Sequence, residues 1–298
     1  MGRVAVASWT ALLLSTTCLA EQRPDPKYTP NLARPAYVTA EPVVAIDQAH
    51  HNLHTLDGRY APFGKLLAAD GYRIGPFVEP FSAESLRGVD VLVIANARSS
   101  NPGMSAFGRD EIVAVQDWVN QGGSLLLISD HAPFGTAASH LAEAFKVDMG
   151  AGFVVARTHG SMSSQILFQK GDLGQHPIII GRDPSEHVHS VLSFTGQSLG
   201  LAPGIIPLLA LPSDALEVPT SNDAAELSRG RKVPARSAAG RAQAVALTFG
   251  KGRVVIAGEA AMFTEQLIPG RVRVGLHDHD DQQFALNTMH WLSRLIGD

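Results

Sequence analysis

Residues 118–131 read WVNQGGSLLLISDH and contain, in order, the end of a predicted helix, a turn and an apolar strand that stops at an acid. Gly122 and Gly123 mark the end of the helix, because glycine readily adopts the left-handed conformation that closes helices. The apolar run behind them is uninterrupted, as in strands buried on both faces of a parallel sheet. This stretch therefore predicts an α/β unit whose strand ends at Asp130.

Helix and strand candidates alternate on both sides of this unit. The predicted strands cover residues 43–47, 72–77, 89–95 and 124–129. The predicted helices cover residues 60–67, 112–119, 137–145 and 281–295. Such alternation is typical of βαβ units, so we expect one α/β domain over residues 43–298 with a mostly parallel central sheet.

Two segments depart from the alternation. Residues 244–249 and 253–258 flank Gly250-Lys251-Gly252 and predict an antiparallel hairpin. Residues 212–241 are rich in Ser, Ala, Arg and Pro, and we interpret them as a surface excursion.

The N-terminus has the pattern of a secretory signal peptide. Arg3 is followed by a mostly apolar run that is too short to span a bilayer, and the small residue Ala20 precedes Glu21. We predict a signal peptide over residues 1–20, and hence a secreted or periplasmic protein with no transmembrane segment in the mature chain. Residues 21–42 contain five prolines and predict an extended tether.

Cys18 is the only cysteine of the chain. A lipid anchor on Cys18 is the alternative to secretion, although Ser15-Thr16-Thr17 is a poor match to the residues that usually precede a lipid-modified cysteine. If cleavage follows Ala20, the mature protein has no thiol. It then has no disulfide, no thiolate metal ligand and no cysteine nucleophile.

Three apolar runs end in an acid, at Asp47, Asp130 and Glu259. Two of these acids have histidines close behind them, His50 after Asp47 and His131 after Asp130. In open α/β sheets, ligands bind outside the carboxyl ends of the strands. The sequence therefore predicts one pocket lined by these carboxylates and imidazoles.

Carboxylates and imidazoles can bind a divalent metal ion or transfer protons. Asp47, His50, Asp130 and His131 are the candidate metal ligands, and a bound ion would activate water for hydrolysis. The structural alternative is that each acid caps its own loop or pairs with an arginine. The residue types favour neither interpretation decisively.

Two further groups of polar residues are present. Residues 277–283 read HDHDDQQ, which resembles a metal-ligand composition but lacks the spacing and central glycine of a calcium loop. Asp280 and Gln283 match a capping box at the start of the last helix instead. The irregular middle of the chain contributes four more histidines, His159, His176, His187 and His189. Whether the segment from 159 to 189 covers the pocket stays open.

Four stretches carry a family resemblance: residues 46–52, 118–131, 258–264 and 283–292. With them the sequence resembles bacterial domains of unknown function in the class I glutamine amidotransferase-like superfamily, which are distantly similar to modules of gliding-motility and intraflagellar-transport proteins. The resemblance implies a flavodoxin-like three-layer sandwich. It does not imply amidotransferase activity, which needs a cysteine at a strand-to-helix elbow.

Two functions remain open from the sequence. The first is a metal-assisted hydrolase with Asp47, His50, Asp130, His131 and Glu259 as its site and a divalent metal ion as its cofactor. The second is a non-catalytic periplasmic module that binds a glycan or a protein. The expected partner is a small molecule, a glycan or an envelope protein. The net charge of −4 gives no electrostatic reason to expect nucleic acid.

Overall fold

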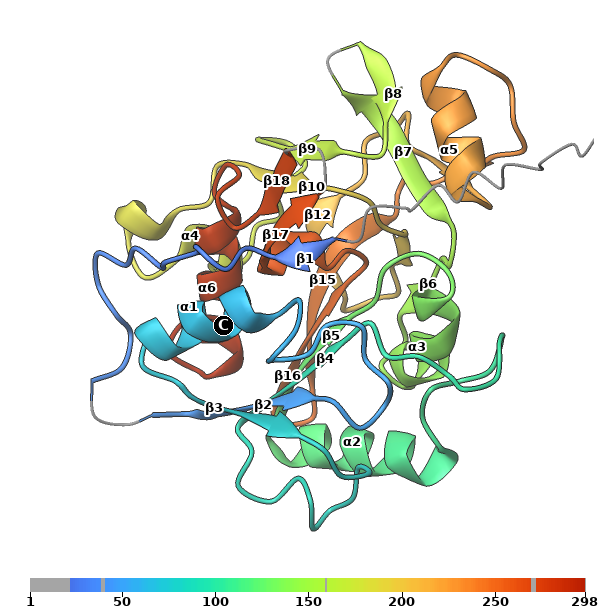
Figure 1. Cartoon of the computed structure of the whole chain (residues 1–298). Helices are drawn as coiled ribbons and strands as arrows, with labels where there is room; N and C mark the ends of the chain where they lie inside the picture. The colour runs from blue at the N-terminus through green and yellow to red at the C-terminus, as the bar shows by residue number, and fades with distance from the viewer. Residues whose placement is uncertain (1–21, 39–40, 159, 269–271, 298) are drawn as a thin grey trace, which may run out of the picture.

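The computed structural model describes residues 22–38, 41–158, 160–268 and 272–297 (Figure 1). The predicted signal peptide lies outside the described residues. No helix in the described part of the chain combines the length and the apolar composition that crossing a membrane requires.

The central sheet has nine strands. Their bounds are β2 Val43–Asp47, β3 Arg73–Phe77, β4 Val91–Ala95, β5 Ser124–Ile128, β6 Asp148–Met149, β11 Leu199–Gly200, β12 Ile206–Ala210, β15 Ala242–Phe249 and β16 Gly252–Ala257. Eight of them follow the order β3-β2-β4-β5-β16-β15-β11-β6, and β12 pairs with β15. Neighbours from β3 to β16 are parallel, whereas β15 pairs antiparallel with β16, β12 and β11, and β11 pairs antiparallel with β6.

The sheet is therefore mixed, and the prediction of a mostly parallel sheet is wrong. The predicted hairpin of β15 and β16 is confirmed, and it reverses the strand direction in the middle of the sheet. Antiparallel neighbours need no helical crossover, and β15 joins β16 through the short turn at Gly250 and Lys251. Two of the strands beyond the hairpin, β6 and β11, have two residues each and are too short to stand out in the sequence.

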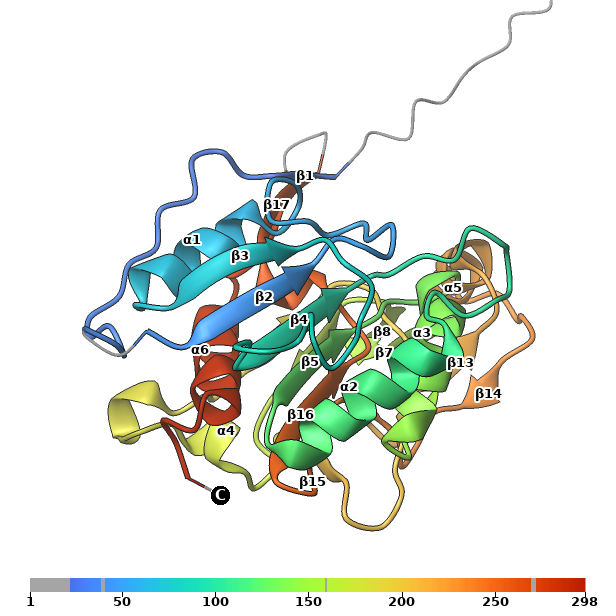
Figure 2. The ribbon, with the colours of Figure 1, turned by 90° about the horizontal axis from the view of Figure 1, so that it is seen from below.

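Helices cover both faces of the parallel half of the sheet. They are α1 Ala61–Ala69, α2 Arg109–Gln121, α3 Phe134–Ala144, α4 Pro177–Ile180, α5 Ser221–Ser228 and α6 Asp281–Leu292. In Figure 2 the strands run between α1 and α6 on one side and α2 and α3 on the other. Alternate residues of β4 enter the two cores: Val91 and Val93 pack on the α1 and α6 side, Leu92 and Ile94 on the α2 and α3 side. An α/β fold with three layers is thus present around these parallel strands.

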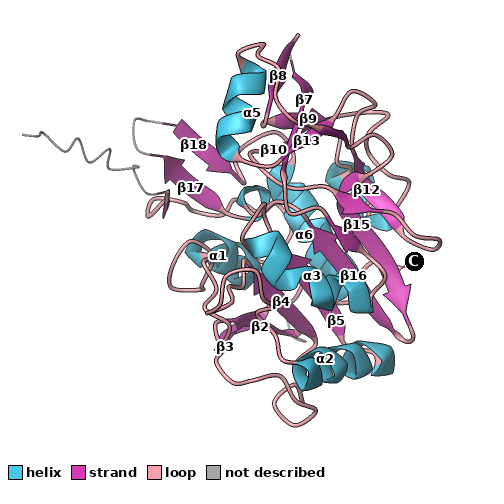
Figure 3. Cartoon of the chain, turned by 90° about the vertical axis from the view of Figure 1, so that its right-hand side faces the viewer, coloured by secondary structure: helices cyan, strands magenta, loops and turns pink. Residues whose placement is uncertain are grey.

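Residues 212–241 contribute two strands to a second sheet. The smaller sheets are built from β1 Arg23–Pro24, β7 Phe153–Thr158, β8 Ser161–Ser163, β9 Ile166–Phe168, β10 Val191–Ser193, β13 Leu216–Val218, β14 Arg236–Ser237, β17 Glu265–Ile268 and β18 Val272–Gly275. The order of the second sheet is β14-β13-β7-β8, and α5 lies beside it at one end of the molecule (Figures 1 and 3). In the segment predicted as a tether, β1 pairs with β17 and Arg34 forms ion pairs with Asp183 and Glu186.

Candidate functional site

Polar side chains follow four neighbouring strands of the sheet at their carboxyl ends. Asp47 is the last residue of β2, Asn96 follows β4, and Asp130 and Glu259 come two residues after β5 and β16. The order of the sheet places β2, β4, β5 and β16 side by side. The three predicted acids therefore lie along one edge of the sheet, with an asparagine between the first two.

Asp47 is fully buried and closes a hydrogen-bond network around His50. His50 Nδ1 lies 2.9 Å from both carboxylate oxygens of Asp47, and His50 Nε2 lies 2.9 Å from Glu111 Oε1. Asn52 Nδ2 and the N–H of Ala49 donate to Asp47 as well, at 3.0 and 3.1 Å. Because both ring nitrogens of His50 face carboxylates, neither is left for a metal ion or a substrate.

The charges of this network favour a protonated His50. Burial lowers the pKa of His50, but the hydrogen bonds and charges of Asp47 and Glu111 outweigh burial and raise the pKa above 6.5. Burial raises the pKa of Glu111, but hydrogen bonds from the N–H of Gly108, from His50 and from the N–H of Phe81 outweigh it and lower the pKa. The protonated ring can then donate to two carboxylates, and it joins the end of β2 to the start of α2.

Asp130 belongs to a second network. Asn96 Nδ2 donates to Asp130 Oδ2 at 2.7 Å and lies 3.1 Å from His54 Nδ1, while the N–H of Asp130 donates to Asn96 Oδ1 at 2.8 Å. Since Asn96 Nδ2 is a donor, Nδ1 of His54 must accept. Burial, and then the charges of Arg59 and Arg98, lower the pKa of His54 to about 3, so this ring is neutral at pH 7.

Glu259 binds the backbone of its own loop. Its Oε1 accepts the N–H of Ala261 at 2.8 Å, and its Oε2 accepts the N–H of Met262 at 2.9 Å. Burial, and then repulsion by Asp130, raise the pKa of Glu259 to about 8. Burial also raises the pKa of Asp130, whose Oδ1 is buried and has no hydrogen-bond partner in the described part of the protein. The two carboxylates are therefore coupled electrostatically, although each is held by different partners.

His131 is held by a loop and a neighbouring strand. Its Nδ1 lies 2.9 Å from the carbonyl oxygen of Ala132, and its ring stacks on Phe153 with centroids 3.9 Å apart. Phe153 is the first residue of β7. The ring of His131 is thereby attached to the second sheet.

The five predicted residues divide into three groups. Asp47 and His50 form one network with Glu111, and Asp130 and Glu259 repel each other as a pair. His131 stacks on Phe153, and its charge acts on Asp130 by lowering the pKa of that carboxyl group. Among the residues that the structure describes, no three His, Cys, Asp or Glu side chains form a group that could hold a metal ion.

Other polar residues of the sequence analysis also have structural partners. Asp280 Oδ2 accepts the N–H groups of His189 and Ser190, at 2.8 and 3.1 Å, and Asp280 makes no side-chain cap of α6, so the predicted capping box is wrong. His176 caps α4 by accepting the N–H of Ile178, and the rings of His187 and His189 lie 4.8 Å apart. His159 lies outside the described residues.

Sequence reasoning missed Asn96 and Glu111. Asn96 directly follows a predicted apolar strand, so the rule that singled out the acids would have found it if amides had been included. Glu111 lies in the first turn of α2, where an acid is expected for helix capping alone. No local pattern links Glu111 to His50, which lies 61 positions earlier.

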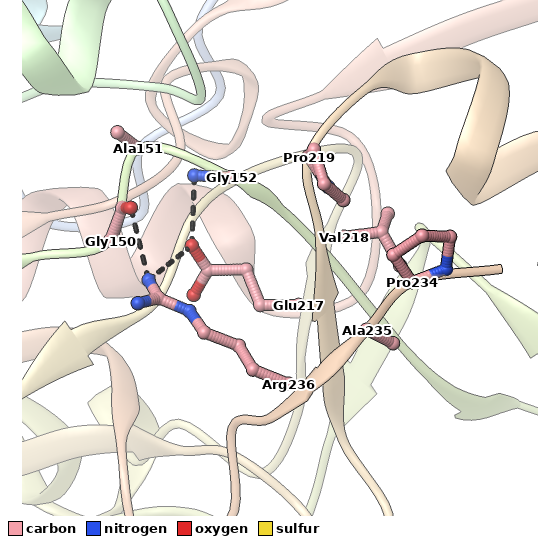
Figure 4. A pocket seen from close by; sticks show the side chains of 9 residues that line it. All are labelled: Gly150, Ala151, Gly152, Glu217, Val218, Pro219, Pro234, Ala235 and Arg236. Atoms are coloured by element: carbon pink, nitrogen blue, oxygen red, sulfur yellow. Dashed lines mark hydrogen bonds and ion pairs between the residues drawn. The ribbon is translucent and has the colours of Figure 1, made fainter.

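A cavity of about 440 Å³ opens beside this edge, between the loop after β6 and the strands β13 and β14. Figure 4 shows Glu217 between Gly152 and Arg236, where the N–H of Gly152 and Nη2 of Arg236 both donate to Glu217 Oε1 at 2.8 Å. Ser198 Oγ donates to Glu217 Oε2. The nine lining residues are Gly150, Ala151, Gly152, Glu217, Val218, Pro219, Pro234, Ala235 and Arg236. We call this space the Glu217 cavity.

Gln197 connects the Glu217 cavity to the strand-end edge. The N–H of Ala151 donates to Gln197 Oε1 at 2.6 Å, and Gln197 Nε2 donates to the carbonyl oxygens of Ser129 and Asp130 at 2.7 and 3.0 Å. One side chain thus separates the cavity wall from the backbone of Asp130.

The fold is similar to that of solved structures. The mmIFT52 N-terminal domain matches with a TM-score of 0.62 at 15% identity, over 86% of this chain and 98% of that chain. A protein described as ThuA-like, from Bacteroides uniformis, matches with a TM-score of 0.46 at 12% identity, over 89% and 95%. A cytoplasmic protein from Salmonella typhimurium matches with 0.44 at 14% identity, over 84% and 98%.

ThuA-like proteins belong to the glutamine amidotransferase-like superfamily. Because the last two TM-scores lie below 0.5, the conclusion on the fold depends on the first comparison alone. No protein-family model and no curated protein matches the sequence.

Proposed function

We propose that this chain is a non-catalytic binding module of the cell envelope that takes a small ligand in the Glu217 cavity. The signal-peptide pattern of residues 1–20 supports its export. The proposal retains the binding alternative of the sequence analysis and moves the site from the strand-end acids to the neighbouring cavity.

One observation carries the proposal: apart from Asp130 Oδ1, the strand-end carboxylates and His50 already have hydrogen-bond partners within the protein. Asp47 and Glu111 occupy both nitrogens of His50, and Glu259 holds two N–H groups of the residues that follow it. A general base needs a free lone pair within reach of the substrate, and a metal ligand needs one that points at the ion. These side chains therefore suit the stabilisation of loops.

The Glu217 cavity has the size and shape that a small ligand needs. Its volume of about 440 Å³ falls within the ~300–1,000 Å³ that is usual for ligand sites. Proline rings at Pro219 and Pro234 form part of its wall, and a wall with few rotatable bonds loses little entropy on binding.

A hydrolase that uses Asp130 is the second candidate, because of a single feature of that residue. Asp130 Oδ1 is buried without a partner among the described residues, and burial raises the pKa of the carboxyl group. A carboxyl group that holds its proton nearer to pH 7 can act as a general acid. His131 follows it directly and is half-buried.

The two candidates differ in the fate of the ligand. We would screen small acids, amines, sugars and soluble peptidoglycan fragments against residues 21–298 by thermal unfolding, and analyse each hit by mass spectrometry after incubation. A binding module is stabilised by about 2.7 kcal/mol when the ligand is at a hundredfold its Kd, and it returns the ligand intact. Asp130→Asn should leave that stabilisation unchanged. Cleavage by the wild type and not by Asp130→Asn would establish the hydrolase instead.

Export is tested separately. Protein recovered from the periplasm or the medium should begin at Glu21 by intact-mass analysis. A mass that corresponds to a lipid-modified Cys18 would replace secretion by membrane anchoring.

A further inference from the structure

A second cavity lies between the β7–β8 hairpin and the strands β9 and β10. Its volume is about 460 Å³, and it shares no lining residue with the Glu217 cavity. Figures 1 and 3 show β8, β9 and β10 near one another at one end of the molecule. Gln165, in the loop between β8 and β9, is one of its eight lining residues. We call this space the Gln165 groove.

Three hydroxyl groups line one side of the Gln165 groove. Thr158 and Ser161 are cross-strand partners in the β7–β8 hairpin, and Ser163 lies two residues further along β8. Cross-strand partners and residues two positions apart point to the same face of a sheet. Ser161 is exposed, and its hydroxyl group makes no hydrogen bond to a described residue. It can therefore both donate to a ligand and accept from one.

The backbone of Gln165 is fixed from both sides. Its carbonyl oxygen accepts from Thr158 Oγ1 at 2.9 Å, and its N–H donates to Ser163 Oγ at 3.0 Å. Its side-chain amide has no partner in the described part of the chain, so one acceptor and two donor positions stay open. An amide on a fixed backbone loses less entropy when it binds a ligand.

The floor of the groove is apolar. Leu167 of β9 and Leu192 of β10 are direct partners in their two-stranded sheet, and both are half-buried. Their neighbours within each strand are buried in the core. Because side chains alternate along a strand, the two leucines face away from the core. They offer apolar surface that a ligand can remove from water.

His279 lines the groove with a strained backbone. Its φ is 41°, which is uncommon for a residue other than glycine, and strain of this kind is concentrated at ligand sites. Nδ1 of His279 lies 3.2 Å from Ser190 Oγ, whereas Nε2 has no partner among the described residues. Since a hydroxyl group can donate or accept, both neutral tautomers of the ring are compatible with this contact. Nε2 can thus serve a ligand as donor or as acceptor.

The polar groups of the groove are uncharged. Among the described residues that line it there is no Asp, Glu, Lys or Arg. A charged ligand would lose hydration here without meeting an opposite charge. Hydroxyl, amide and imidazole groups pair well with ligand hydroxyl groups, which also donate and accept. A neutral sugar ring combines such hydroxyl groups with a face of C–H groups, and it matches both the polar side and the apolar floor.

We propose that the Gln165 groove binds one neutral pyranose unit. The C–H face of the sugar lies on Leu167 and Leu192. Its hydroxyl groups bind the amide of Gln165, the hydroxyl group of Ser161 and Nε2 of His279. The volume of the groove falls within the ~300–1,000 Å³ that is usual for ligand sites. This is a second site, and it does not depend on the function proposed for the Glu217 cavity.

The test measures the binding of matched sugars by NMR titration. The probes are the methyl pyranosides of glucose, galactose and mannose, each beside its uronate, which replaces the C6 hydroxyl group by a carboxylate. At least one methyl glycoside should bind, and its uronate should bind at least about tenfold more weakly. Cellobiose and lactose are added to distinguish the source. Tighter binding of a disaccharide than of the glycoside would assign the site to a glycan chain, and equal binding to a free sugar.

Three variants connect binding to the groove. Gln165→Ala should weaken glycoside binding by about threefold to tenfold, since it removes the amide and keeps the backbone bonds that fix the loop. Gln169→Ala, at an exposed position outside the lining, is the control and should change binding by less than about twofold. Ser161→Trp fills the groove from an exposed strand position. It should abolish binding while the unfolding midpoint stays within a few degrees of the wild type.

Equal binding of glycosides and uronates would overturn the inference, as would glycoside binding that survives Ser161→Trp. Failure of every glycoside to bind would do the same, and so would binding of the capped dipeptide N-acetyl-Ala-Ala-amide in place of the sugars. Ser161→Trp leaves the lining of the Glu217 cavity unchanged. A cavity ligand that still binds this variant would uphold the proposed function whatever the glycosides do.

Discussion

Asn96 and Asp130 hold each other by two reciprocal hydrogen bonds, from Asn96 Nδ2 to Asp130 Oδ2 at 2.7 Å and from the N–H of Asp130 to Asn96 Oδ1 at 2.8 Å. The pair joins the ends of β4 and β5. Asn96 also has a φ of 50°, a left-handed conformation that asparagine tolerates better than most residues.

Asn96→Ala should therefore destabilise the fold by about 2–4 kcal/mol. The substitution leaves the buried carboxylate of Asp130 without its donor and adds backbone strain at a positive φ. Urea unfolding followed by circular dichroism measures the change. Asn101→Ala, at an exposed loop position, is the control and should change the free energy of unfolding by less than about 0.5 kcal/mol. Equal effects of the two substitutions would show that the Asn96–Asp130 pair contributes nothing.

The link between His50 and Glu111 should be visible in a histidine titration. The pKa of His50 should lie above 6.5 in the wild type, and Glu111→Gln should lower it, because one of the two carboxylates that stabilise the protonated ring is lost. NMR of the ring protons as a function of pH measures both values. Glu84→Gln, at an exposed position, is the control and should leave the pKa of His50 unchanged.

The same link predicts how stability depends on pH. The pKa of His50 is raised in the folded state, so its contribution is fully present below pH 6.5 and is lost as the pH rises through the folded value. The pKa of Glu111 is lowered, so its contribution is present above pH 4.5 and is lost as the pH falls through the folded value. Glu111→Gln should therefore lower the free energy of unfolding most between pH 4.5 and 6.5, where both contributions are present. A decrease that does not vary with pH would contradict the interpretation that charged Glu111 stabilises protonated His50.

Glu259 should make the protein less stable at alkaline pH. Its folded pKa of about 8 lies above the unfolded value of 4.5, so its contribution is fully present below pH 4.5 and is lost as the pH rises through 8. Between about pH 5 and 9, the free energy of unfolding of the wild type should fall by roughly a few kcal/mol more than that of Glu259→Gln.

The slope with pH is the quantity to compare, because Glu259→Gln also places an amide beside the N–H of Met262 and lowers stability at every pH. Glu79→Gln, at an exposed position, serves as the control and should keep the slope of the wild type. Parallel pH profiles for the wild type and Glu259→Gln would mean that Glu259 is ionised throughout this range.

Gly152 should tolerate no side chain. A Cβ atom there would lie 2.6 Å from Glu217 Cγ, 2.6 Å from Glu217 Oε1 and 2.8 Å from the carbonyl oxygen of Val218. Gly152→Ala should therefore destabilise the fold by about 1–3 kcal/mol by overpacking, and it should weaken ligand binding in the Glu217 cavity. Gly75→Ala is the matched control, since nothing lies within 4 Å of the added atom. A destabilisation as small as that of Gly75→Ala would show that the loop moves away from Glu217 at little cost.

Much of the parallel half of the fold could be predicted from local sequence. All of its strands except β3 contain apolar runs long enough to be recognised, and the helices between them show apolar residues at helical spacing. In the antiparallel half the hairpin of β15 and β16 was predicted, whereas β6 and β11 could not be, because they contain two residues each and are defined by their pairing partners. Propensity carries little information over such short segments.

The sequence by itself determined that Asp47, Asp130 and Glu259 follow buried strands. An acid placed there comes to the carboxyl edge of the sheet whatever the rest of the chain does. Only the tertiary structure decided what these acids do, because the electrostatic state of a buried carboxylate depends on the partners that other segments bring. Glu111 meets His50 from α2, and Glu217 is met by Gly152 from the loop before β7 and by Arg236 from β14. Hydrogen bonds act over about 3 Å, and contacts at that range between distant segments exist only once the chain is packed.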